Sequence, residues 1–206
     1  MAQYSKTIYL IRHGQTEYNL KGIVQGSGID SDLNENGQIQ AKKFFEAYKH
    51  IPFDKIYTSK LKRTVQSVQS FIDLGTQHEA FSGFNEISWG DQDGIASNAE
   101  MHNYFVEVST AWANGNLDLQ IGGGESPNQV AERQQPVMEE ILTRHEEKTI
   151  IICMHGRAMR ILLCHIMGKS LTEMDTFEHS NLCLYILGLK DGKLELVEAN
   201  CVSHLS

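Results

Sequence analysis

Hydrophobic residues along the chain fall into short continuous runs and longer stretches with helical spacing. The runs predict strands at 7–11, 55–58 and 149–154, and the last is apolar enough for a strand buried on both faces. The helical spacing predicts five helices, at about 34–51, 61–75, 97–115, 126–144 and 156–168. Strands that alternate with helices predict an α/β domain with a mostly parallel central sheet and helices on both faces.

Turn and capping residues set several of these boundaries. Ser126-Pro127-x-Gln129 combines an N-cap, a proline at the first helical position and a capping-box glutamine, and Ser97-x-x-Glu100 has the same capping spacing. Residues 115–126 are rich in glycine and predict a loop. Asp191-Gly192 joins two apolar runs, at 181–189 and 193–199, which predicts a terminal hairpin and therefore at least one antiparallel strand.

The helix predicted at 61–75 has an apolar stripe on one face, formed by Leu61, Val65, Val68 and Ile72. Arg63 lies on the first turn and outside this stripe. We therefore expect its side chain to lie off the face of the helix that packs on the core.

Composition favours one soluble globular domain. The chain has 206 residues, of which 41% are hydrophobic and 21% charged, and no segment approaches the ~18 consecutive apolar residues of a membrane span. A net charge of −8 disfavours non-specific binding to nucleic acid or to an anionic membrane. The four cysteines are widely spaced with no C-x-x-C pair, which is typical of reduced core residues and of a cytoplasmic protein.

Two predicted strands end directly in histidine and glycine, at Arg12-His13-Gly14 and at His155-Gly156. Ligands of such sheets bind beyond the carboxyl ends of the strands, and Arg63 begins the helix after a third strand. These groups together favour a pocket for a phosphate. Taken alone, His155 could be a buried structural histidine, and Arg63 could be an arginine on a solvated helix face. The other histidines lack the spacing of metal ligands, so we expect no metal and no cofactor.

Residues 12–19, Arg-His-Gly-Gln-Thr-Glu-Tyr-Asn, resemble the opening motif of the histidine phosphatase superfamily, which has the phosphoglycerate mutase-like fold. Further motifs of that family follow in the same order: Gln25-Gly26, Ser59-x-Leu61-x-Arg63-Thr64-x-Gln66-Ser67, Glu86-Ile87, Gly123-Gly124-Glu125-Ser126 and His155-Gly156. The similarity extends from Thr7 to about Gly168. It implies one domain over 1–206 with a small lid inserted over the site at about 87–126.

The resemblance also implies a role for each matching residue. His13 is the nucleophile that forms a phosphohistidine, and Glu86 is the general acid and base. The phosphate oxygens are held by the remaining residues of the motifs, namely Arg12, Arg63, His155, Asn19 and Gly156, while Gln25 and Gly26 contact the rest of the substrate. A nucleophilic His13 has to be neutral, whereas a phosphate-binding His155 is a better donor when it is charged.

The segment after Glu86 favours the phosphatase branch, because the mutases carry Arg-x-Tyr-Gly where this chain has Ile-Ser-Trp-Gly at 87–90. Residues 95–124 contain no lysine or arginine, which favours a small metabolite with one phosphate. The alternatives are a phosphoglycerate mutase-type phosphotransferase, a metal-dependent hydrolase and a non-catalytic module that binds phospholigands. Arg157 either widens the basic pocket or points away from it, and no residue pattern indicates the oligomeric state.

Overall fold

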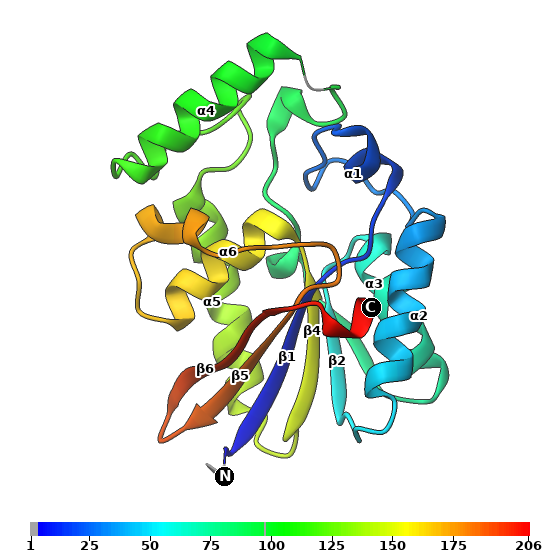
Figure 1. Ribbon diagram of the computed structural model, residues 1–206. Helices are drawn as coiled ribbons and strands as arrows, with labels where there is room; N and C mark the ends of the chain where they lie inside the picture. Colours follow the sequence, from blue (N-terminus) through cyan, green and yellow to red (C-terminus); the bar gives the residue numbers. More distant parts are fainter. Residues whose placement is uncertain (1–3, 97) are drawn as a thin grey trace.

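A six-stranded sheet forms the centre of the computed structural model, which describes residues 4–96 and 98–206 (Figure 1). The strands are β1 (Lys6–Arg12), β2 (Lys55–Thr58), β3 (His78–Ala80), β4 (Thr149–Met154), β5 (Leu184–Lys190) and β6 (Lys193–Cys201). Their order is β3-β2-β4-β1-β5-β6. The first four run parallel to one another, whereas β5 is antiparallel to β1 and β6 is antiparallel to β5. The predicted α/β class is confirmed, including the antiparallel terminal hairpin.

Helices cover both faces of this sheet (Figure 1). The α-helices are α1 (Glu17–Lys21), α2 (Glu35–Tyr48), α3 (Lys62–Asp73), α4 (Ala99–Ala113), α5 (Pro127–Thr143) and α6 (Gly156–Ile166). Short 3₁₀ turns add η1 (Ser82–Phe84), η2 (Gly90–Gln92), η3 (Leu171–Thr176) and η4 (Ser203–Leu205). Helices α2 and α3 lie on one face, and α5 and α6 lie on the other. The short elements β3, α1 and η1 to η4 have no counterpart among the sequence predictions.

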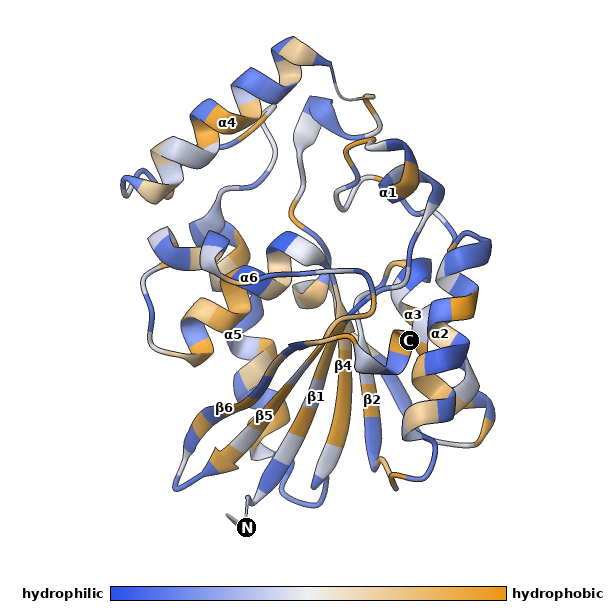
Figure 2. Ribbon diagram, in the orientation of Figure 1, coloured by the Kyte–Doolittle hydropathy of each residue, from blue (hydrophilic) through white to orange (hydrophobic). Residues whose placement is uncertain are grey.

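Alternate residues of the central strands divide the core into two clusters. In β4, Ile150 and Ile152 join the cluster shared with α5 and α6, while Ile151 and Cys153 join the cluster shared with α2 and α3. Because both faces are covered, β4 is apolar throughout, as its continuous run predicts (Figure 2). Cys153, Cys164 and Cys183 are buried free thiols, in agreement with their expected place in the core.

The buried face of α3 differs from the predicted stripe. Arg63, Thr64 and Ser67 are buried together with Val68 and Phe71, so the expectation that Arg63 lies off the core-facing side is wrong. The first turn of α3 packs against the polar ends of the strands, where hydrogen bonds satisfy its side chains. For example, Ser67 Oγ accepts a hydrogen bond from the backbone N–H of Gly14 at 2.9 Å. Hydrophobic spacing carries no information about such a buried polar surface.

The segment at 87–126 contains η2, α4 and a glycine-rich loop, and α4 lies beyond the carboxyl ends of the parallel strands (Figure 1). Asn98 is the N-cap of α4, and its Oδ1 accepts the N–H of Met101 at 2.8 Å. Ser97, the expected cap, lies outside the described residues. The capping box of Ser126 and Gln129 at the start of α5 is confirmed. No helix in the described ranges has both the length and the apolar character needed to cross a bilayer.

Candidate active site

The two strand-terminal histidines meet at the carboxyl end of the sheet. His13 follows β1 and His155 follows β4, and the pairing of Arg12 with Met154 places the ends of these parallel strands side by side. The two imidazole centroids are 5.1 Å apart. Both rings are almost fully buried, with His13 3% exposed and His155 fully covered. The predicted meeting of the two histidines therefore occurs.

Hydrogen bonding fixes the tautomer of His13. Its Nδ1 lies 2.7 Å from the carbonyl oxygen of Gly14, and since a carbonyl can only accept, Nδ1 carries the proton. In the neutral ring, Nε2 therefore keeps its lone pair. Burial and the positive charges of Arg63 and Arg12 hold the pKa of His13 well below its usual range. This ring is neutral and has a nucleophilic nitrogen.

His155 is neutral as well, for a related reason. The Nε–H of Arg63 donates to His155 Nδ1 at 3.2 Å, so the ring proton is on Nε2 and points to Ser59 Oγ at 2.8 Å. Burial, followed by the charges of Arg63 and the neighbouring groups, holds the pKa of His155 well below its usual range. The expected charged His155 does not occur in this arrangement, because a proton on Nδ1 would face the N–H of Arg63.

Arg63 connects α3 to the loop that follows α1. Its Nη1 donates to the carbonyl oxygen of Ile29 at 2.6 Å and its Nη2 to that of Gly26 at 3.2 Å. The Gly26 N–H in turn donates to Asp93 Oδ1 at 2.6 Å. Burial lowers the pKa of Arg63 to about 10, so the guanidinium stays charged near neutral pH. The loop that carries Gly26 is thereby fixed against the phosphate side of the site.

Arg12 has a donor that lacks a partner. Its Nη1 donates to the carbonyl oxygen of His179 at 2.6 Å, whereas its buried Nε has no hydrogen-bond partner among the described residues. In the same ranges, no carboxylate oxygen lies within 4.0 Å of a nitrogen of Arg12 or Arg63. Arg63 is fully buried and the Arg12 Nε is covered, so two cations without a paired carboxylate at these strand ends favour the binding of an anion.

Glu86 approaches the same site through the start of α6. Its Oε1 accepts the N–H groups of Ile87 and Ala158, both at 2.9 Å, and its Oε2 accepts the N–H of Arg157 at 3.1 Å. His155, the N-cap of α6, has no side-chain capping bond, so the Glu86 carboxylate takes the place of a cap. Glu86 is 7% exposed. The expected acid–base residue thus lies at the first turn of α6, which begins directly after His155.

The side chains of His179 and Arg12 lie close to the backbone of Gly156. A Cβ at this position would lie 2.5 Å from His179 Cδ2 and 3.4 Å from Arg12 Nε. The absence of a side chain lets His179 approach the same region as Arg12 and the first turn of α6. Burial and the charges of Arg12, Arg160 and Arg157 lower the pKa of His179 to about 3, so this ring is also neutral. Neither helical nor strand periodicity indicates that His179 lies here.

Asn19 and Gln25 are partly committed to local structure. Asn19 Oδ1 accepts the N–H of Thr16 at 3.2 Å, which completes the capping box of α1, and it also accepts Asn181 Nδ2 at 3.2 Å. Gln25 Oε1 accepts the Thr16 hydroxyl at 2.8 Å, and its Nε2 donates to Ser31 Oγ. The amide nitrogen of Asn19 is therefore the part of that side chain that can serve a ligand.

Asn181 is a site residue that the sequence predictions omit. Its Nδ2 donates to the carbonyl oxygen of His13 at 3.1 Å as well as to Asn19 Oδ1, and the N–H of Leu182 donates to the same His13 oxygen at 3.4 Å. The segment between η3 and β5 thus holds the backbone of His13 in place. The only trace of this in the sequence is a polar residue just before an apolar run.

Arg157 turns toward α4 and η3. Its Nη1 donates to Asp175 Oδ1 at 2.6 Å, and its guanidinium carbon lies 5.4 Å from the ring centre of Trp112 and 5.9 Å from that of Phe105. The ion pair and the aromatic contacts occupy this cation. Of the two alternatives for Arg157, the structure favours a side chain that points away from the basic pocket, toward Asp175 and the aromatic residues of α4.

The fold and the site define an α/β protein in which two arginines and two neutral histidines lie at the carboxyl ends of parallel strands. A family model of the histidine phosphatase superfamily (branch 1) matches residues 8–202, and the chain belongs to this family. The chain is 27% identical over 199 residues to phosphoserine phosphatase 1 of Hydrogenobacter thermophilus, covering 96% of this chain and 93% of that one. It is 30% identical over 182 residues to a 2,3-bisphosphoglycerate-dependent phosphoglycerate mutase of Mesorhizobium japonicum, covering 84% and 87%.

A solved structure of similar fold is the phosphoserine phosphatase of Entamoeba histolytica in complex with 3-phosphoglyceric acid. It superposes with a TM-score of 0.85 at 25% identity, over 98% of this chain and 100% of that one. These similarities support a phosphatase activity, and therefore a hydrolase. Within residues 4–96 and 98–206, no three His, Cys, Asp or Glu side chains are grouped as a metal site.

Proposed function

We propose that the protein hydrolyses the phosphate monoester of a small metabolite through a phosphohistidine intermediate on His13, without a metal ion. The single observation that carries this proposal is the pair of cations at the strand ends: the buried Arg63 and the half-buried Arg12, whose Nε has no partner among the described residues, lack a paired carboxylate and lie at the same strand ends as the neutral ring of His13. Family membership and the phosphatases among the similar proteins support it.

In the first step, the lone pair of His13 Nε2 attacks phosphorus and the bond from phosphorus to the ester oxygen breaks. Glu86, in its protonated form, gives its proton to the departing oxygen, so the alcohol leaves neutral. The enzyme is left with a P–N bond at His13 and a carboxylate at Glu86. Imidazole is a suitable covalent nucleophile, and the Gly14 carbonyl on Nδ1 orients it.

In the second step, water attacks the phosphoryl group while the Glu86 carboxylate takes one of its protons. The P–N bond breaks, and inorganic phosphate and neutral His13 are released with Glu86 protonated again. The same carboxyl group therefore serves as acid and then as base, and a positioned group of this kind contributes about 10² to 10⁴ in rate.

The remaining residues bind and stabilise the phosphoryl group. Arg12 and Arg63 supply positive charge, while the amide of Asn19 and the backbone at Gly156 supply further donors. His155 accepts a hydrogen bond from Arg63 at Nδ1, and its Nε2–H is the donor that it can offer to the phosphoryl group. The last two predicted site residues, Gln25 and Gly26, are in the loop fixed by Arg63 and contact the alcohol side of the substrate.

Hydrolysis of p-nitrophenyl phosphate tests this proposal, with chelator present throughout. We expect His13→Ala to lose at least about 10⁴-fold in kcat, because a nucleophile cannot be replaced by the remaining groups. His50→Ala, at an exposed histidine, is the matched control and keeps the activity. Activity that disappears with chelator, or that survives in His13→Ala, would overturn the proposal.

The second candidate function is that of a phosphoglycerate mutase, and an assay for isomerisation of 3-phosphoglycerate distinguishes it from a phosphatase. The similarity to a phosphoglycerate mutase favours testing it, whereas the sequence at 87–90 and the lack of cations at 95–124 favour hydrolysis. We expect phosphate release without isomerisation of the phosphoglycerate.

A further inference from the structure

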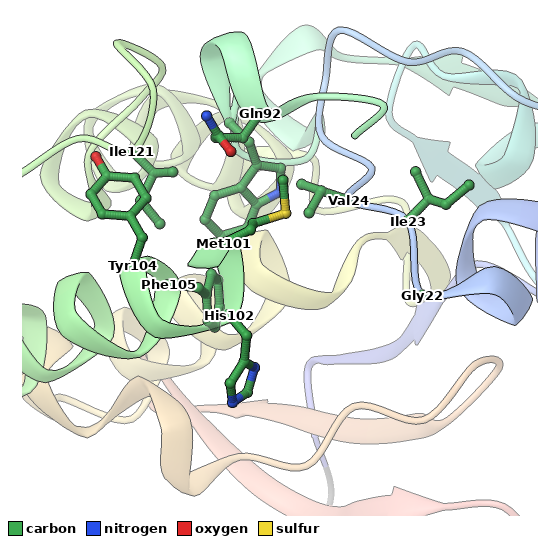
Figure 3. A pocket seen from close by; sticks show the side chains of 10 residues that line it. Gly22, Ile23, Val24, Gln92, Met101, His102, Tyr104, Phe105 and Ile121 are labelled. Carbon is green, nitrogen blue, oxygen red and sulfur yellow. The ribbon is translucent and has the colours of Figure 1, made fainter. Parts of the chain in front are cut away.

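A cavity of about 230 Å³ lies beneath α4, between this helix and the loop that follows α1. Its walls are mainly apolar and are formed by Ile23, Val24, Trp89, Met101, Phe105 and Ile121. Figure 3 shows Val24, Met101, Phe105 and Ile121 gathered around the space, while the imidazole of His102 points away from them. An apolar space of this size suits an organic group better than a row of ordered waters.

Two segments connect this cavity to the phosphate site. Val24 precedes Gly26 by two residues, and the Gly26 carbonyl accepts the hydrogen bond from Arg63 Nη2. Trp89 follows Glu86 by three residues, a separation that an extended chain spans in about 10 Å. The backbone of the cavity wall therefore comes within about 10 Å of that of Glu86, and lies two residues from the Gly26 carbonyl that binds Arg63.

The wall nearest the site is closely packed. A Cβ at Gly26 would collide with the Ile87 carbonyl oxygen and would lie 2.7 Å from Trp89 Cδ1. The Trp89 ring packs against Phe105 at 5.6 Å and against Trp112 at 6.2 Å between centroids. An aromatic wall fixed in this way offers contact area without the entropy cost of ordering a flexible one.

Charge around the cavity is unfavourable to a second anionic group. None of its lining residues is a lysine, an arginine or a carboxylate, and residues 95–124 carry acidic side chains only, at Glu100, Glu107 and Asp118. Arg157, the cation that stacks on the aromatic wall, is paired with Asp175 at 2.6 Å. A carboxylate or second phosphate placed in this space would lose its hydration without gaining an ion pair.

We infer that this cavity binds the alcohol portion of the substrate, and that this portion is uncharged and largely apolar. The inference rests on the proposed phosphatase function and adds the substrate class to it. A cavity of about 150 Å³ holds a benzene ring, so this larger one takes an alkyl chain or a ring system up to about two fused rings. Substrates with a charged alcohol portion, such as phosphoserine or 3-phosphoglycerate, are then the poorer ones.

A series of primary alkyl phosphates tests the inference, because their leaving groups are similar in basicity and differ in apolar surface. We compare ethyl, butyl and hexyl phosphate with 3-phenylpropyl phosphate, phosphoserine and 3-phosphoglycerate. Burial of each methylene raises kcat/KM by about fourfold until the cavity is filled. The hexyl and phenylpropyl esters are expected to exceed phosphoserine and 3-phosphoglycerate by more than tenfold.

Two lysine substitutions on α4 test whether the preference for longer alkyl esters arises in this cavity. Met101→Lys introduces a cation into the cavity, and we expect it to reduce the ratio of kcat/KM for hexyl over ethyl phosphate by about 15-fold, since it removes the benefit of about two buried methylenes. Val106→Lys is the matched control, because Val106 lies on the same helix, is 47% exposed and does not line the cavity. The control should leave the ratio unchanged.

The outcomes separate this inference from the proposed function. Hydrolysis of ethyl phosphate that requires His13, combined with a flat series or with phosphoserine or 3-phosphoglycerate as the best substrate, would overturn the substrate class and leave the phosphatase function standing. The substrate class would also be overturned if Val106→Lys and Met101→Lys changed the hexyl-to-ethyl ratio of kcat/KM equally. Failure to hydrolyse any ester, in wild type as in His13→Ala, would instead overturn the proposed function.

Discussion

The strand-end site and the 87–126 segment are built in different ways. At the strand ends, Arg63 alone makes hydrogen bonds to three partners, and His13, His155 and Arg63 are nearly or fully buried. In the 87–126 segment, α4 has only Val108 and Trp112 buried, and aromatic contacts with a few hydrogen bonds hold it in place. The densely hydrogen-bonded region suits chemistry that needs fixed distances, whereas the mainly apolar one suits selection of the alcohol.

Charge divides the two regions in the same way. Arg12 and Arg63 lie at the strand ends, while residues 95–124 hold no cation at all. In the proposed mechanism, the positive charge that binds the phosphate is therefore concentrated where the phosphoryl group is transferred. In this account, the strand-end site determines the reaction and the other region determines which ester reacts.

Glu86 lies at the border between the two regions, and its substitution has the largest expected effect among the predictions below. Glu86→Gln keeps an acceptor for the N–H groups of α6 but supplies no proton. We expect kcat for ethyl phosphate to fall by about 10² to 10⁴, and kcat for p-nitrophenyl phosphate to fall less, because p-nitrophenolate leaves without protonation. Equal losses with both substrates would show that Glu86 acts mainly through the position of α6.

Substitution of Arg12 tests whether the arginines at the strand ends bind the anion. Arg12→Lys removes the buried Nε donor, and loss of a hydrogen bond to a charged group weakens binding by about 1.5 to 3 kcal/mol. The inhibition constant of inorganic phosphate should therefore rise by roughly 10- to 100-fold, since each 1.4 kcal/mol is a factor of ten. Arg160→Lys is the control, because Arg160 is paired with Asp175, and an equal effect there would contradict the assignment.

Substitution of Asn181 tests how strongly kcat depends on the exact position of His13. Asn181→Ala removes the hydrogen bonds to the His13 carbonyl and to Asn19, and misplacement of the nucleophile should lower kcat by roughly tenfold with little change in KM. Steady-state kinetics with a long alkyl phosphate measure both constants. Asn114→Ala, at an exposed asparagine at the end of α4, is the control. A rise in KM without a loss in kcat would place Asn181 among the binding residues instead.

Acidification should destabilise the strand-end site. The folded state holds His13 and His155 neutral, with pKa values well below the usual 6.5, while the unfolded chain protonates them near that value. Unfolding therefore takes up protons below pH 6.5, and stability is complete above that pH and declines as the pH falls. Each group contributes a slope of at most ~1.4 kcal/mol per pH unit. His155→Gln should flatten the urea-unfolding slope between pH 6.5 and 5.5, and an unchanged slope would contradict the neutral state of His155.

Much of the framework could be predicted because its signals are local. The continuous run of β4 reflects burial on both faces, and the capping box at Ser126 fixes the start of α5 within the chain itself. The two histidines could be placed together because parallel strands bring their carboxyl ends to one edge of the sheet. The family motifs then indicated Arg63 and Glu86 as members of the same site.

The remaining features depend on contacts between distant segments. Arg63 is buried because α3 packs on polar strand ends, which a hydrophobic stripe cannot indicate. The neutral state of His155 follows from its burial and from the charge of Arg63, whose N–H also fixes the tautomer. Asn181 reaches His13 across 168 positions of sequence. The cavity beneath α4 is lined by four segments of the chain, at 22–24, 89–92, 101–105 and 121, and no local pattern indicates that they meet.

The covalent intermediate on His13 is the most direct test of the account. Wild type and His13→Ala are mixed with p-nitrophenyl phosphate, quenched in alkali within a single turnover, digested and analysed by mass spectrometry. We predict one phosphoryl group on the peptide that contains His13 in wild type, formed as fast as p-nitrophenol is released, and none in His13→Ala. Product release without a phosphorylated peptide, or with the phosphoryl group on another residue, would contradict the proposed mechanism.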